Sequence, residues 1–320
     1  MALRKPVHQV IDGVPRCAGI VPDTLRKNLK FRAEKGDVVQ STFPKSGTHW
    51  MMYIVQLILR EGDPVNTHEE FGKEFRMIEY MDINDWKPSL PVRTFTTHLP
   101  LTEDIITEDG RYIYVARNPW DVCVSMYHMV TNISSYDYQD ATFEEFVNVF
   151  VSGNFGYGDY FEHVASAYDL RHEPNVLFVT YETMKMDTRN VVLRVAHFLG
   201  ERYGQAFSQE EKLLHDLLER TKPENMRSVM VVNFRGENSS SHWQEVLERS
   251  KATCKEGYGG DENKYGVVRA AKVGSWKEYF TPELLRRMEA RIVEAEKVTS
   301  FMDLWKDIRA ETLKFSQGSG

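Results

Sequence analysis

The sequence predicts an α/β protein: a single domain built on an open parallel sheet of the P-loop-like kind, with helices on both faces. The chain has 320 residues, of which 42% are hydrophobic and 12% aromatic, so it can bury a large core. Short apolar runs alternate with amphipathic stretches, and no repeat of fixed period interrupts them. This alternation is typical of consecutive βα units, and we expect one domain over residues 1–320.

Each predicted strand ends beside a polar residue. The four strands are expected at residues 37–43, 93–97, 111–116 and 175–180, and they lead to Lys45, His98, Arg117 and Tyr181. Ligands of open parallel sheets bind beyond the carboxyl ends of the strands, where the loops converge. We therefore expect these four side chains to face one crevice.

The helices have recognisable start and stop signals. Residues 48–60 and 188–199 carry apolar residues at helical spacing, and Gly200 closes the second helix. Pro119 can open a helix after the third strand, and Thr281-Pro282 reads as another start. Two capping boxes are predicted, Thr142 with Glu145 and Ser208 with Glu211.

Two segments are predicted to lie outside this regular pattern. Residues 231–268 mix Gly, Asn, Ser and charged residues, with only a short helix-like piece at 242–249. We expect a long surface loop or lid there, and a flexible tail at 316–320.

Composition excludes several classes of partner. The net charge of −7 offers no broad basic surface, which argues against nucleic acid or an anionic membrane as the partner. Cys17, Cys123 and Cys254 are widely spaced and suggest neither a disulfide framework nor a metal site. No signal peptide or membrane-spanning stretch is recognisable, so we expect a cytoplasmic protein.

The turn PKSGT at residues 44–48 has the properties of a phosphate-binding loop. It joins a strand to a helix, so backbone amides and the hydroxyls of Ser46 and Thr48 can surround a phosphate while Lys45 adds a charge. Gly47 allows close approach of the backbone. The Walker A pattern is absent, and an ordinary turn with a solvated lysine is the alternative interpretation.

Five segments, FPKSGTHW, THLP, YVARNPWDVCVSMYH, VTYETMKMD and RAAKVGSWKEYF, resemble the cytosolic sulfotransferase family and occur in the family's order. They cover the chain from about residue 37 to residue 280. The resemblance implies transfer of a sulfuryl group from 3′-phosphoadenosine 5′-phosphosulfate (PAPS) to a hydroxyl of a small organic acceptor. It implies no metal, and the sequence shows no cluster with metal-ligand spacing.

The resemblance also implies a role for individual residues. Lys45 would contact the sulfuryl group and the leaving phosphate oxygen, and His98 would be the general base in an in-line displacement. The implied donor-binding residues are Ser46, Gly47, Thr48 and His49 for the 5′-phosphate, Trp50, Tyr181 and Thr221 for the adenosine, and Arg117, Ser125 and Arg269 for the 3′-phosphate. Taken singly, Arg117, Ser125 and Tyr181 could equally have structural roles.

The sequence departs from the family at several positions. Thr96 replaces a lysine two residues before His98, Pro223 replaces an adenine-contacting phenylalanine, and Ala270-Ala271 replace Lys-Gly after Arg269. Lys272 is the residue that could compensate for the lost lysine. The family's dimerisation pattern is also broken, so the choice between monomer and dimer stays open.

Two loops supply the candidate acceptor contacts, and their aromatic side chains favour a flat, phenol-like acceptor. Glu70 and Asp137 lie in the same loops, so a phenolic amine is a further hypothesis. The candidates are Phe71, Phe75, Ile78 and Tyr80 in one loop and Ile133, Tyr136 and Tyr138 in the other.

Two alternatives stay open, and a third is disfavoured. The first is a magnesium-dependent phosphotransferase that uses the PKSGT turn. The second is a nucleotide-binding protein of the same fold that has lost turnover, which the departures from the family motifs allow. The third, a carbohydrate sulfotransferase of the Golgi, is disfavoured because no membrane anchor is recognisable.

Overall fold

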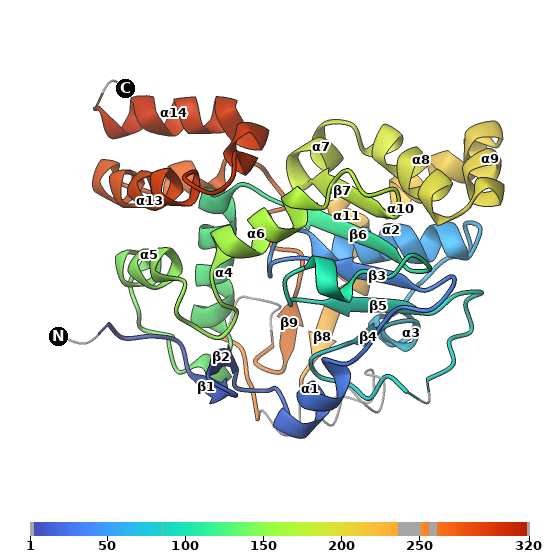
Figure 1. Cartoon of the computed structure of the whole chain (residues 1–320), viewed down its shortest axis with the longest axis horizontal. Helices are drawn as coiled ribbons and strands as arrows, with labels where there is room; N and C mark the ends of the chain where they lie inside the picture. The colour runs from blue at the N-terminus through green and yellow to red at the C-terminus, as the bar shows by residue number, and fades with distance from the viewer. Residues whose placement is uncertain (1–2, 85, 236–250, 256–260, 319–320) are drawn as a thin grey trace.

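The fold of the chain is given by a computed structural model that describes residues 3–84, 86–235, 251–255 and 261–318. Within these residues a five-stranded parallel sheet has the order β4-β5-β3-β6-β7 (Figure 1). Its strands are β3 (Val38–Ser41), β4 (Arg76–Met77), β5 (Thr94–Thr97), β6 (Arg111–Ala116) and β7 (Val176–Thr180). The four strands predicted from the sequence are confirmed, and β4 is a short edge strand that the sequence did not reveal.

Helices cover both faces of the sheet, as predicted (Figure 1). Tyr112 and Tyr114 of β6 pack into one core cluster, while Ile113 and Val115 pack into another. The first cluster includes residues of α4 (Pro119–Asn132), α5 (Phe143–Ser152), α6 (Tyr160–Asp169) and α13 (Pro282–Ala295). The second includes residues of α2 (Thr48–Leu59), α8 (Thr188–Leu199), α10 (Glu211–Arg220) and α11 (Pro223–Val229). Alternate side chains of one central strand thus separate the two cores.

The remaining elements surround this framework. They are β1 (His8–Ile11), β2 (Val14–Cys17), α1 (Pro22–Asn28), α3 (His68–Lys73), η1 (Glu103–Ile105), η2 (Ser134–Tyr136), α7 (Tyr181–Met186), α9 (Glu201–Gln209), η3 (Ser275–Glu278), η4 (Phe301–Trp305) and α14 (Lys306–Ser316). The β1–β2 hairpin turns at Asp12 and Gly13, both with positive φ, as a type I′ turn requires.

The ends of the segment predicted to be a surface loop are ordered into an antiparallel ribbon. β8 (Val231–Asn233) pairs with β9 (Lys264–Gly266), and Phe234, Cys254 and Tyr265 are buried in the core. The helix-like piece at 242–249 lies outside the described residues. At the C-terminus, α14 continues to Ser316, and residues 319–320 of the predicted tail also lie outside the described residues.

Three helix-start predictions are confirmed and one is wrong. Pro119 and Pro282 occupy first-turn positions, and Thr142 and Glu145 form the reciprocal capping box of α5. Ser208 does not cap α10. It lies inside α9, which runs on to Gln209, so the cap of α10 falls on Glu210, which makes no side-chain capping bond.

The two predicted capping boxes form a matched test. Thr142→Ala removes an acceptor for the Glu145 N–H and should lower the free energy of unfolding by about 1 kcal/mol. Ser208→Ala should change it by less than about 0.5 kcal/mol, because Ser208 is an exposed helix residue. Urea denaturation measures both, and equal losses would contradict this assignment of the helix boundary.

Candidate active site

The loop between β3 and α2 has the backbone conformation of an anion-binding turn. Lys45 and Gly47 both have positive φ, at 69° and 112°, a backbone pattern found in anion-binding turns. A Cβ at residue 47 would lie 3.0 Å from the Tyr181 ring, so glycine is required by space as well as by conformation. Lys45 Nζ donates to the Tyr265 hydroxyl at 3.0 Å, which connects this loop to β9.

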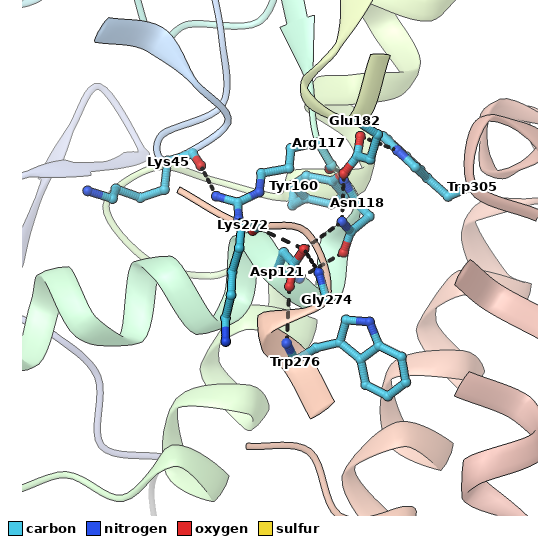
Figure 2. A network of polar contacts seen from close by, with 10 residues as sticks. All are labelled: Lys45, Arg117, Asn118, Asp121, Tyr160, Glu182, Lys272, Gly274, Trp276 and Trp305. Carbon is cyan, nitrogen blue, oxygen red and sulfur yellow. Dashed lines mark hydrogen bonds and ion pairs between the residues drawn. The ribbon is translucent and has the colours of Figure 1, made fainter. Parts of the chain in front are cut away.

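Arg117, the residue after β6, spans two segments that are far apart in sequence (Figure 2). Its guanidinium donates to the Lys45 carbonyl and the Lys272 carbonyl, each at 3.1 Å. It also stacks on Tyr181, with its central carbon 4.3 Å from the ring centroid. Because each partner fixes one direction of the planar group, the arginine is held before any ligand arrives.

Asp121, in the first turn of α4, holds residues 272–276, here called the late segment, against Arg117 (Figure 2). Its fully buried carboxylate accepts the N–H groups of Gly274 at 2.8 Å and Trp276 at 3.1 Å, and lies 3.9 Å from Arg117. The amide of Asn118 donates to the same carboxylate and to Glu182. Glu182 in turn accepts from the Trp305 indole at 2.8 Å, so η4 is joined to this network.

Aromatic and cationic groups surround the place predicted for the adenosine. Trp50 packs edge-to-face on Tyr181 with ring centroids 5.5 Å apart, and Lys185 Nζ lies 5.7 Å from the Trp50 ring centroid. Thr221 is the C-cap residue of α10, and Pro223 starts α11. A flat heterocycle can be held between such groups by stacking.

His98, directly after β5, has a defined tautomer. Its Nδ1 lies 2.8 Å from the Thr42 carbonyl, which can only accept, so Nδ1 carries the proton. In the neutral ring Nε2 then holds the lone pair. Burial, opposed by the Thr42 hydrogen bond and assisted by the nearby charge of Lys45, lowers the pKa of His98 to about 4. A neutral imidazole whose Nε2 carries a lone pair is the form that can accept a proton.

These groups line one cavity of about 320 Å³. Of the residues predicted for catalysis and donor binding, Lys45, Gly47, Thr48, His49, Trp50, His98, Arg117, Ser125, Tyr181, Thr221 and Arg269 line it. Ser46 does not, because its side chain is fully buried beneath the loop, where its hydroxyl has no partner in the described residues. Trp50 Nε1 and the Nε atoms of Arg117 and Arg269 are likewise buried with no partner in the described residues.

The predicted acceptor residues divide into two groups. Tyr80, Ile133 and Tyr136 line the cavity. Phe71, Phe75, Ile78 and Tyr138 do not: they are buried in the two cores. Helix α3 buries Phe71 in the core and presents His68 to the cavity instead. The spacing of apolar residues in the sequence does not predict this orientation.

Glu70 and Asp137 do not lie at the acceptor site, and the Lys272 ammonium does not take the place of the missing lysine. Glu70 accepts the Asn66 N–H beside α3, and Asp137 is exposed. Neither lines the cavity, whose described lining contains no aspartate or glutamate. Lys272 turns its ammonium to Glu278 and offers only its carbonyl to Arg117.

Several lining residues were missed from the sequence. Cys17 and Gly19 come from the N-terminal hairpin region, Tyr157 from the loop before α6, and Phe234 and Tyr265 from the β8–β9 ribbon. They belong to segments without a motif, and only their packing brings them to the cavity.

The matching domain model identifies the family. The sulfotransferase domain model matches residues 35–301. The 3-beta-hydroxysteroid sulfotransferase of Cavia porcellus is 30% identical over 280 residues, covering 82% of this chain and 85% of the relative. Sulfotransferase 2A1 of Rattus norvegicus is 30% identical over 292 residues, covering 86% and 90%. The chain therefore belongs to the cytosolic sulfotransferase family and is a PAPS-dependent sulfotransferase.

Solved structures show the same fold. Mouse sulfotransferase SULT7A1, solved as a complex with PAP, superimposes with a TM-score of 0.64 at 21% identity, covering 97% of this chain and 99% of that one. Retinol dehydratase, in complex with androsterone and inactive cofactor PAP, gives 0.66 at 21% identity, covering 88% of each chain. No helix among the described residues is long and apolar enough to cross a membrane. These residues also hold no cluster of three potential metal ligands.

The Asp121 network generates a prediction about nucleotide binding. Asp121→Asn removes the charge that strengthens two backbone hydrogen bonds, each worth about 1.5–3 kcal/mol to a charged acceptor. The late segment should then loosen, and the affinity for adenosine 3′,5′-bisphosphate should fall at least about tenfold by calorimetry. Asp140→Asn, which breaks an exposed ion pair with Arg4, is the control and should leave affinity unchanged. Unchanged affinity in the Asp121 variant would contradict the role of the network.

Proposed function

We propose that this enzyme transfers the sulfuryl group of PAPS to a hydroxyl of a small, uncharged phenolic acceptor. The observation that supports the proposal is the shared cavity, which is lined by the Lys45 loop, Arg117 and His98. The lining combines phosphate-binding features with neutral aromatic side chains. Such a cavity suits an anionic donor beside a flat acceptor.

The donor would be held by groups that are already oriented. Arg117, Ser125 and Arg269 would bind the 3′-phosphate, and Gly47, Thr48 and His49 would bind the 5′-phosphate with the buried Ser46 hydroxyl below them. Trp50, Tyr181 and Thr221 would contact the adenosine. The donor supplies an activated sulfuryl group when bound. Lysine and arginine side chains offset its negative charge.

The chemistry of this chain's own residues follows from their charge. His98 Nε2 would accept the proton of the acceptor hydroxyl as its oxygen attacks in line. Lys45 would stabilise the negative charge that grows on the leaving phosphate oxygen. The family's lysine two residues before the histidine is Thr96 here, whose buried hydroxyl has no partner in the described residues. Lys45 would therefore supply more of the charge stabilisation at the leaving phosphate oxygen.

The acceptor is inferred from the lining. Tyr80, Tyr136, Tyr157 and Phe234 give edges and faces that suit an aromatic ring. Because the described lining offers no carboxylate, a neutral phenol fits it better than the phenolic amine considered from the sequence. The steroid sulfotransferases among the relatives make an alicyclic alcohol the second candidate.

An acceptor panel tests the proposal. Purified enzyme, PAPS and a metal chelator are combined with a neutral phenol, a phenolic amine or a hydroxysteroid, and sulfated product is measured by mass spectrometry. We expect turnover with chelator present and the highest kcat/KM for the phenol. A higher value for the steroid would overturn the acceptor class. Nucleotide binding without turnover of any acceptor would favour the silent binding protein.

Two substitutions test the catalytic assignments. Lys45→Ala should lower kcat by about 10²–10³-fold, because a preorganised positive group is lost where charge develops. His98→Ala should lower it by about 10²–10⁴-fold, because the proton acceptor is lost. Circular dichroism checks that both variants stay folded. Near-normal kcat in the histidine variant would remove His98 as the base.

The pKa of His98 predicts the acidic side of the pH profile. Because the pKa is lowered to about 4, the imidazole is neutral throughout pH 5.5–8, and protonation of His98 should not lower kcat/KM there. His49, His68 and His163 also have pKa values lowered to about 3–4 by burial. Glu79 titrates near pH 7, so the profile is measured in Glu79→Gln as well. Half-loss of activity near pH 6.5 in that variant would show an ordinary histidine pKa.

A further inference from the structure

Neighbouring groups hold the His98 residue from three directions. Its ring Nδ1 donates to the Thr42 carbonyl at 2.8 Å, and its own carbonyl accepts from His163 Nε2 at 3.1 Å. The third contact is the His98 backbone N–H, which donates to the Glu79 carboxylate. No part of the proposed chemistry uses Glu79 directly, and it does not line the cavity.

The Glu79 carboxylate takes the place of a missing sheet partner. The Ile78 N–H bonds to the Thr96 carbonyl at 3.0 Å, so the parallel ladder would next pair the His98 N–H with the Ile78 carbonyl. That carbonyl instead accepts from the Asn28 amide at 2.8 Å. The His98 N–H would be left unpaired at the end of β5, and Glu79 provides the acceptor.

This arrangement is costly for stability. Glu79 is only 2% exposed, and its second carboxylate oxygen has no partner in the described residues. Burial raises the pKa of Glu79 to about 7, although hydrogen bonds from His98 and Thr97 and the charge of Arg16 act in the opposite direction. A buried polar group left unpaired costs about 1–3 kcal/mol. An apolar side chain would avoid that cost, but it could not accept the His98 N–H.

We propose that Glu79 is a positioning residue that fixes the backbone of His98 and so aims Nε2 at the acceptor hydroxyl. The inference rests on the proposed function, in which His98 is the base. The hydrogen bond to the Thr42 carbonyl fixes the rotation of the imidazole ring. The hydrogen bond to Glu79 fixes the backbone position from which the His98 side chain extends. A displacement of about 1 Å at a reacting group can cost about 10²-fold in rate, so this hydrogen bond acts on kcat.

Three substitutions separate the hydrogen bond from the charge and from packing. Glu79→Leu removes the acceptor and should lower kcat at least tenfold. Glu79→Gln keeps an acceptor oxygen without the charge and should stay within threefold of the unchanged enzyme. Glu79→Asp keeps the charge but shortens the side chain by one methylene. Its kcat should lie between those of the leucine and glutamine variants. The affinity for adenosine 3′,5′-bisphosphate should stay within twofold in all three, because Glu79 does not line the cavity.

A double-mutant cycle with His98 completes the test. If Glu79 acts through His98, Glu79→Leu should have no further effect on the residual activity of His98→Ala. Unchanged kcat in a folded Glu79→Leu variant would overturn the inference, as would equal losses in the leucine and glutamine variants. If the leucine variant fails to fold, unchanged kcat in Glu79→Asp overturns it instead. Normal activity of His98→Ala alone would show that the proposed base, and not only its positioning, is wrong.

Discussion

The hydrogen bonds of the Arg117 guanidinium connect the parts of the donor site. One runs to the carbonyl of Lys45 in the phosphate loop, and the other runs to the carbonyl of Lys272 in the late segment. Asp121 keeps the late segment in place by accepting the amides of Gly274 and Trp276. Burying an arginine is costly unless its donors find partners, and here two of its nitrogens donate to backbone carbonyls of two distant segments. The position of each side therefore depends on the other.

The cavity combines strong positive charge with histidines that stay neutral. Lys45, Arg117, Lys185 and Arg269 line it, whereas burial keeps the nearby imidazoles uncharged. The two effects support each other, because the charge of Lys45 also lowers the pKa of His49 and His98. A site built this way can hold a polyanion and still provide a proton acceptor at neutral pH.

Family motifs and structural support come from different parts of the chain. Lys45, His98 and Arg117 stand at strand ends and were found from the sequence. Glu79 and His163 hold His98 through buried hydrogen bonds, and Asp121 holds the backbone of Gly274 beside Arg117. None of the three was singled out from the sequence. Polar side chains are common near strand and helix ends, so residue type alone does not distinguish a buried side chain that positions another residue from a solvated surface group.

Four of the five strands, the helices that flank the sheet and the polar residues after the strands followed from the sequence, because hydrophobic periodicity and turn chemistry are local properties. Side-chain direction in irregular segments did not follow, since it depends on which face packs against distant elements. Phe71 turned into the core while His68 reached the cavity, and Tyr265 entered it from a segment rich in turn residues. Ser208 had the spacing of a cap, yet α9 continued through it. Tertiary packing decided these positions, because burying apolar area contributes more free energy than any single local preference.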